Sequence, residues 1–208
     1  MPRMTQQDVL KELQRVGAII DDHVVLSSWR HSGKYINKDE AFDEPGVIES
    51  FCRELATRFE DLDVDFVVAP AVAGVCYAFD IVHYMFAMIH RAFADKDGAG
   101  GFIFKRGFER KLRGKRVLVL EDVSTTSATI RKVMDAVEAV GGIVVAVGML
   151  WNRGGVTAEM LGTPRLECLV NIQFESWEAN ECPLCKAGVP VNISVGHGAE
   201  FVARQAAA

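Results

Sequence analysis

Two adjacent acids follow an aliphatic run and stand directly before a cluster of hydroxyl residues. The aliphatic run is residues 117–120, the acids are Glu121 and Asp122, and the hydroxyl residues are 124–127. Carboxylates accept hydrogen bonds from the two hydroxyls of a sugar diol. Hydroxyls and the backbone N–H groups of a turn suit a phosphate. A ligand with both groups, a ribose phosphate, therefore fits this combination better than a ligand with only one of them.

The flanking residues predict the elements that position this cluster. The short aliphatic run is typical of a strand buried on both faces of a parallel sheet. From Ile130 onward the apolar residues recur at helical spacing; they are Val133, Met134, Val137 and Val140. An open α/β sheet binds ligands beyond the carboxyl ends of its strands. Other α/β proteins with acids at a strand end, such as flavodoxin-like or receiver domains, fit the same pattern.

The whole stretch resembles the PRPP-binding signature of the type I phosphoribosyltransferases. The resemblance implies an α/β fold with a central, mainly parallel sheet flanked by helices and a small N-terminal hood. It assigns Glu121 and Asp122 to the ribose hydroxyls and to the positive charge that develops on the ring. It assigns the turn to the 5′-phosphate, with Val123, Ser124, Thr125, Thr126, Ser127, Ala128 and Thr129 as PRPP-binding residues. Ser127 is a departure, because the family usually has Gly there.

Residues 18–41 predict a hairpin with strands at 24–26 and 34–37. The run is similar to the N-terminal hood of orotate phosphoribosyltransferases, which has a Ser-rich turn followed by a Ser, an aromatic residue and an Asn. The resemblance implies that Ser27, Tyr35 and Ile36 line a pyrimidine pocket. Trp29 stands where the family usually has Gly. An ordinary surface hairpin with a core Tyr is the alternative.

A small-residue segment follows the predicted strand 65–70. It consists of Ala71, Val72, Ala73 and Gly74. Small side chains allow the oxygens of a ligand to approach backbone N–H groups. The resemblance implies that this turn receives the pyrophosphate of PRPP; a plain strand-to-helix connection is the alternative.

Residues 90–115 form the most polar long segment and are rich in Gly and in cations. Such a stretch is typical of a hairpin or a mobile lid. The resemblance implies that Lys96 on the outgoing arm, and Lys105 and Arg106 on the return arm, neutralise the pyrophosphate. A solvated basic hairpin without this role is the alternative.

Arg153 follows the predicted strand 143–150, at the same edge of the sheet as the acids. Its planar guanidinium suits a carboxylate or an imide edge. The resemblance implies that Arg153 holds orotate together with Thr125. An exposed loop Arg is the alternative.

Five cysteines at irregular spacing argue against a disulfide framework and favour a reducing cytoplasm. Cys182 and Cys185 form a Cys-x-x-Cys pair, but a zinc site needs four ligands. No second pair is evident, and His197 is the only nearby His. A redox pair is not expected either, since the cysteines are not predicted at a helix start. A similar Glu-Cys-Pro-Leu-Cys run occurs in one branch of bacterial and archaeal orotate enzymes.

The length of 208 residues predicts a single domain, with the hood contributed by about 1–41 and part of 175–208. A formal net charge of −5 argues against a nucleic-acid partner. No apolar run is long enough for a membrane span, and the start lacks the pattern of a signal peptide.

The resemblance implies an enzyme that converts orotate and PRPP to orotidine 5′-monophosphate and pyrophosphate. It implies Mg²⁺ as a cofactor carried on PRPP, without a direct protein ligand, and a homodimer. A transferase for another base and a non-catalytic PRPP-binding regulator are the two alternatives.

Overall fold

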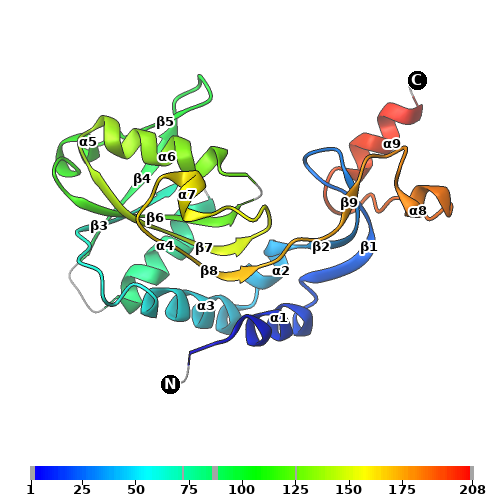
Figure 1. The fold of residues 1–208 in the computed structure, drawn as a ribbon, viewed down its shortest axis with the longest axis horizontal. Coiled ribbons are helices and arrows are strands. Elements are labelled where there is room, and N and C mark those ends of the chain that lie inside the picture. The colour runs from blue at the N-terminus through cyan, green and yellow to red at the C-terminus, as the bar shows by residue number, and fades with distance from the viewer. Residues whose placement is uncertain (1–2, 72, 86–88, 125, 207–208) are drawn as a thin grey trace. The chain divides into compact units, whose positions relative to one another are not determined.

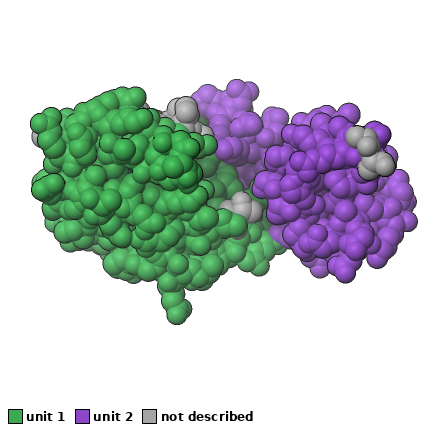
Figure 2. Space-filling model, turned by 90° about the horizontal axis from the view of Figure 1, so that it is seen from above, with its two compact units in different colours: residues 1–9, 46–173 green, residues 10–45, 174–208 purple. Residues whose placement is uncertain are grey.

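The computed structural model describes residues 3–71, 73–85, 89–124 and 126–206. Contacts divide the chain into two compact units (Figure 2). Unit 1 comprises residues 1–9 and 46–173, and unit 2 comprises residues 10–45 and 174–208.

Unit 1 is an α/β layer structure around a mainly parallel sheet (Figure 1). The strand order is β5-β4-β3-β6-β7-β8. All neighbours are parallel except β4 and β5, which form an antiparallel hairpin. The strands are β3 (Phe66–Pro70), β4 (His90–Lys96), β5 (Phe102–Ile103), β6 (Arg116–Ser124), β7 (Ile143–Asn152) and β8 (Leu166–Asn171). The predicted fold class is confirmed.

Helices cover both faces of this sheet, with α6 on one face and α3 and α4 on the other (Figure 1). The helices of unit 1 are α3 (Pro45–Thr57), α4 (Ala73–Tyr84), α5 (Phe108–Lys111), α6 (Ala128–Ala139) and α7 (Ala158–Leu161). The side chains of β6 alternate between the two layers. Val117 and Val119 belong to the core cluster that contains Ile130 and Val133 of α6.

Gly148 of β7 allows Leu120 and Phe59 to pack closely against the face of the sheet that lies away from α6. A Cβ at this position would lie 2.7 Å from Cδ2 of Leu120 and 2.9 Å from Cε2 of Phe59. Both neighbours are fully buried, so a larger residue would displace the core beneath the sheet.

Unit 2 is built from both ends of the chain around a small antiparallel sheet of order β1-β2-β9. Its strands are β1 (Ile19–Val25), β2 (His31–Ile36) and β9 (Ser176–Trp177), and its helices are α2 (Lys38–Phe42), α8 (Pro183–Lys186) and α9 (Gly198–Ala206). Helix α1 (Gln6–Arg15) begins in unit 1 and ends in unit 2. The predicted hairpin of β1 and β2 is confirmed, although both strands begin earlier than predicted.

The expectation for residues 90–115 is confirmed only in part. Residues 90–115 were expected to form a hairpin or lid; β4 and β5 do form a hairpin, but residues 90–94 of β4 pair in parallel with β3 in the main sheet. The burial of Ala92 and Ala94 explains this, since only every second residue of β4 needs to be apolar. The remaining hairpin is short, because β5 has two residues.

No helix within the described part of the chain is long and apolar enough to cross a membrane.

Candidate active site

A cavity of about 520 Å³ lies in unit 1, where β3, β6, the β4–β5 hairpin and the start of α6 meet. Its lining combines one acid, two lysines, one hydroxyl and several glycines. The lining residues are Pro70, Ala71, Lys96, Gly98, Gly100, Gly101, Phe102, Glu121, Thr129 and Lys132. The cavity thus occupies the sheet edge where the sequence predicted a ligand.

Glu121 is the acid of this cavity, and its side chain is buried at 7% exposure. Asp122 is also buried, but it is not among the described residues that line the cavity. Strand β6 continues to Ser124, so the side chains of Glu121 and Asp122 leave opposite faces of the sheet. Oδ1 of Asp122 accepts a hydrogen bond from the backbone N–H of Val123 at 2.8 Å. The structure therefore brings one of the two predicted acids to the cavity.

The start of α6 supplies a hydroxyl and a cation. Thr129 and Lys132 are three residues apart, which places them on one helix face, and both line the cavity. Ser127 is the N-cap residue, has φ −66°, and makes no side-chain capping hydrogen bond. The N–H of Ala128, the first of the helix, instead donates to Oγ1 of Thr126 at 3.4 Å. Sequence reasoning missed Lys132, although its spacing from Thr129 was a usable signal.

The turn between β4 and β5 is held by one carboxylate. Oδ1 of Asp97 accepts hydrogen bonds from the N–H groups of Ala99, at 2.7 Å, and Gly101, at 2.8 Å. These bonds, the one from Gly101 first, lower the pKa of the Asp97 carboxyl. A Cβ on Gly101 would lie 2.6 Å from Oδ2 of Asp97. Glycine at this position therefore allows the turn to close beside Lys96, and the sequence analysis did not single it out.

Lys105 and Arg106 do not line the cavity among the described residues. Arg106 adopts a left-handed backbone conformation, φ +61°. Its Nη1 lies 2.6 Å from Oδ2 of Asp95, and its guanidinium carbon lies 5.0 Å from the centre of the Phe93 ring. The cavity lining therefore does not support the expectation that these two cations face the pyrophosphate. Lys96 does line the cavity, and its role toward pyrophosphate stays a prediction.

The small-residue segment after β3 differs from the predicted tight turn. Ala71 lines the cavity, but its N–H donates to the carbonyl of Ala94 at 2.9 Å and is not offered to a ligand. Val72 lies outside the described residues. Ala73 and Gly74 already belong to α4, whose start, rather than a turn, presents N–H groups.

Arg153 follows β7 directly beside the turn after β6. The N–H groups of Arg153 and Gly154 donate to the carbonyl of Ser124 at 2.8 Å and 3.2 Å, and Oγ of Ser124 donates to the carbonyl of Thr126 at 2.8 Å. The two strand ends are therefore tied together. Thr125, the predicted partner of Arg153, lies outside the described residues.

The predicted base-binding residues Ser27, Tyr35 and Ile36 belong to unit 2. Ser27 is exposed, Tyr35 is half-buried and Ile36 is buried. Their grouping around a pyrimidine stays a prediction. Trp29 has φ +65°, a left-handed conformation that Gly adopts more easily than a residue with a Cβ. Cζ of Arg204 lies 4.0 Å from the centre of its ring.

Comparison with known proteins identifies the family. The sequence matches no family model. It is 34% identical over 188 residues to the orotate phosphoribosyltransferase of Caldanaerobacter subterraneus subsp. tengcongensis, covering 90% of this chain and 96% of the relative. This chain belongs to the orotate phosphoribosyltransferase family. The orotate phosphoribosyltransferase of Thermus thermophilus is 36% identical over 184 residues, covering 88% of this chain and 98% of the relative.

Solved structures of the family share the fold. The orotate phosphoribosyltransferase of Aeropyrum pernix has a TM-score of 0.64 at 23% identity, covering 78% of this chain and 92% of that chain. The Mycobacterium tuberculosis H37Rv orotate phosphoribosyltransferase in complex with PRPP has a TM-score of 0.61 at 24% identity, covering 79% of this chain and 94% of that chain. Family membership and fold are thus established by independent comparisons.

Proposed function

We propose that this chain catalyses the transfer of a phosphoribosyl group from PRPP to orotate, giving orotidine 5′-monophosphate and pyrophosphate. The observation that carries the proposal is the lining of the cavity in unit 1. Glu121 supplies a buried carboxylate for the ribose diol, Thr129 a hydroxyl at a helix start, and Lys96 a cation at the end of β4. The relatives named above support orotate as the base.

The reaction is a substitution at the anomeric carbon of PRPP. A ring nitrogen of orotate forms the new bond as the bond to pyrophosphate breaks, and the transition state carries positive charge on the ribose. The carboxylate of Glu121 favours this charge, because a fixed anion in a buried site stabilises a cation that develops beside it. The proton of the attacking ring nitrogen passes to solvent or to the departing pyrophosphate, so we assign no side chain as a general base. Positioning and charge neutralisation then account for the catalysis.

Mg²⁺ would be carried on the oxygens of PRPP without a direct protein ligand, and the acid Glu121 in the lining is compatible with a cation nearby. When bound, the ion neutralises part of the charge of the leaving pyrophosphate. Lys96 and Lys132 add positive charge to the cavity lining, where they would hold the anionic ends of PRPP.

The base site and the assembly complete the proposal. Within unit 1 we assign Thr125 and Arg153 to orotate, and within unit 2, the hood, Ser27, Tyr35 and Ile36 remain the predicted base-binding residues. We further propose a homodimer that works in the cytoplasm. The transferase family to which the chain belongs supports these assignments.

Loss of orotate absorbance in the presence of PRPP and Mg²⁺ tests the activity directly. Glu121→Gln should lower kcat by roughly 10²–10³-fold, the usual cost of removing one group that stabilises developing charge. Asp122→Asn is the matched comparison and should cost less, since Asp122 does not line the cavity. Turnover of uracil or adenine in place of orotate would assign another base. PRPP binding without turnover of any base would favour a regulator.

A further inference from the structure

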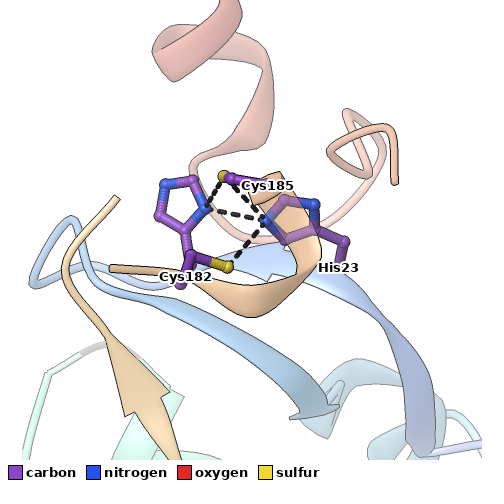
Figure 3. Close-up of side chains that lie close together, drawn as sticks. His23, Cys182 and Cys185 are labelled. Atoms are coloured by element: carbon purple, nitrogen blue, oxygen red, sulfur yellow. Dashed lines mark hydrogen bonds between the residues drawn. The ribbon is translucent and has the colours of Figure 1, made fainter. Parts of the chain in front are cut away.

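Four metal-ligating side chains meet inside unit 2. They are His23 on β1, His31 at the start of β2, and Cys182 and Cys185 at the start of α8. Their ligand atoms all lie within 4.8 Å of one another. Figure 3 shows His23 beside the two thiols, with a dashed line to each of them. We propose that these residues form a structural Zn²⁺ site.

Three nitrogen–sulfur distances match those of a tetrahedral centre with two nitrogen and two sulfur ligands. Zinc bonds of about 2.3 Å to sulfur and about 2.0–2.1 Å to nitrogen place neighbouring nitrogen and sulfur ligands about 3.5 Å apart. Nε2 of His23 lies 3.6 Å from Sγ of Cys182 and 3.7 Å from Sγ of Cys185. Nδ1 of His31 lies 3.3 Å from Sγ of Cys185.

One pair is closer than a bound ion requires. Nε2 of His23 and Nδ1 of His31 are 2.7 Å apart, which is a hydrogen bond between the two rings. Zinc would separate two nitrogen ligands by about 3.3 Å. Binding therefore replaces the shared proton and moves the two rings apart by a few tenths of an ångström, which the β1–β2 hairpin can accommodate.

A neighbouring carbonyl orients His23 as a ligand. Nδ1 of His23 lies 2.8 Å from the carbonyl oxygen of Val189, so Nδ1 carries the proton and donates it. Nε2 then presents its lone pair to the cluster. A ligating His commonly donates its other N–H to a carbonyl or carboxylate in this way, which fixes the tautomer and the ring orientation.

Burial and charge also fit zinc. His23, His31 and Cys182 are each at most 1% exposed, and Cys185 is half-buried. Two cysteine thiolates balance the charge of Zn²⁺, and their two protons pass to the solvent, so the bound site is neutral. Four protein ligands leave no open coordination position, which is typical of a structural rather than a catalytic site.

Unit 2 has a small hydrophobic core, which a bound metal ion would help to stabilise. Among its described residues the buried hydrophobic side chains are Leu13, Ala18, Val24, Val25, Ile36, Ala41 and Cys182. A unit with so little apolar core is commonly held together by a metal or a disulfide. Zinc would fasten α8, a single helical turn, to the β1–β2 hairpin.

Two sequence interpretations are corrected by this geometry. The second ligand pair is present, but it comes from residues more than 150 positions before the cysteines. The cysteines do stand at a helix start, because Cys182 is the N-cap residue of α8. A dithiol redox pair is therefore the competing assignment, although it gives no reason for two buried histidines aimed at the sulfurs.

Metal analysis of the purified full-length protein tests the proposal. We expect about one Zn²⁺ per chain. After the zinc is removed under reducing conditions, Co²⁺ should bind and give the strong visible absorption of a tetrahedral site with sulfur-to-cobalt charge transfer. Cys185→Ser and His31→Asn should each weaken zinc binding by more than the roughly 10–100-fold that loss of an outer partner costs. Cys168→Ser, a cysteine of unit 1, is the control and should leave binding unchanged.

Three results would overturn the proposal. The reduced, metal-free protein could fail to take up Zn²⁺ or Co²⁺. The cobalt spectrum could persist unchanged in Cys185→Ser. The protein could instead be isolated with a Cys182–Cys185 disulfide and no metal. Because each readout is metal content or a spectrum, the outcome is separate from the test of transferase activity.

Discussion

Arg106 donates a hydrogen bond to Asp95, with 2.6 Å between Nη1 and Oδ2. The pair joins Arg106, in the loop that follows β5, to Asp95, the penultimate residue of β4. Its side chains are 59% and 22% exposed, respectively. The bond therefore assigns Arg106 a place in the support of the hairpin, next to Phe93, rather than in the lining of the cavity.

Substitution of single cations distinguishes a residue that binds PRPP in the cavity from one that only supports the β4–β5 hairpin. Lys96→Ala should lower kcat/KM for PRPP by roughly 10²-fold, because it removes charge from the cavity wall. Arg106→Ala should lower the free energy of unfolding by at most about 1 kcal/mol, the usual value of an exposed ion pair, with a smaller loss of activity. Steady-state kinetics and urea denaturation measure the two effects. Lys105→Ala is the matched control, since Lys105 is exposed.

If Arg106→Ala lowered kcat/KM as much as Lys96→Ala and left the stability unchanged, Arg106 would have to be assigned to pyrophosphate binding after all.

The carboxylate of Asp97 should make the β4–β5 turn sensitive to pH. Backbone N–H groups of Gly101 and Ala99 lower its pKa. A lowered pKa in the folded state means that this contribution to stability is present above the ordinary carboxyl pKa of about 3.9 and is lost as the pH falls through the lowered value. Asp97→Ala should raise KM for PRPP and speed amide hydrogen exchange at Ala99 and Gly101, because the turn borders the cavity.

Exchange rates at those two amides that are equal in the wild type and the variant would show that Asp97 does not hold the turn. Glu60→Ala, at an exposed acid of the same unit, serves as the control.

Two substitutions of Trp29 separate backbone strain from the contacts of the indole. A left-handed conformation costs a residue with a Cβ about 1–2 kcal/mol. Trp29→Ala removes the ring and keeps this cost, whereas Trp29→Gly removes both. We expect Trp29→Ala to have the lower free energy of unfolding, by about 1 kcal/mol. Arg204→Ala removes only the cation above the ring and should cost about 0.5–1 kcal/mol.

Equal stability of the alanine and glycine variants in urea denaturation would contradict the strain argument.

Ser127 tests how closely a phosphate approaches the start of α6. Its φ of −66° is ordinary for any residue, so Gly is not needed there for the backbone conformation. What distinguishes Ser from Gly is then the Cβ and the hydroxyl. Ser127→Gly should lower KM for PRPP if the Cβ obstructs the phosphate. Ser127→Ala, which keeps the Cβ, should not; an unchanged or higher KM in the glycine variant would sink the idea.

The local order of strand, turn and helix could be predicted from the sequence. The aliphatic run of β6, the hydroxyl-rich turn and the apolar face of α6 are adjacent in the chain, so their periodicity sufficed to place Glu121 and Thr129 at one sheet edge. The β1–β2 hairpin was predictable for the same reason. Such patterns report contacts between near neighbours along the chain.

Other features depended on how the elements pack. Strand β4 looked polar because only one of its faces is buried deeply. Glu121 and Asp122 point to opposite faces of the sheet because β6 continues to Ser124 and the side chains of a continuous strand alternate between its faces. The sequence did not show where β6 ends. The sequence showed two acids, and the sheet decided which of them lines the cavity.

The cluster of four proposed zinc ligands shows most clearly what could not be predicted from the sequence. The sequence by itself determined the four residue types and marked Cys182 and Cys185 as a pair. It could not join them to His23 and His31, because no local periodicity connects side chains that lie more than 150 residues apart. Only the pairing of β1 with β2 and the return of the C-terminal segment to that hairpin brought the four ligand atoms together.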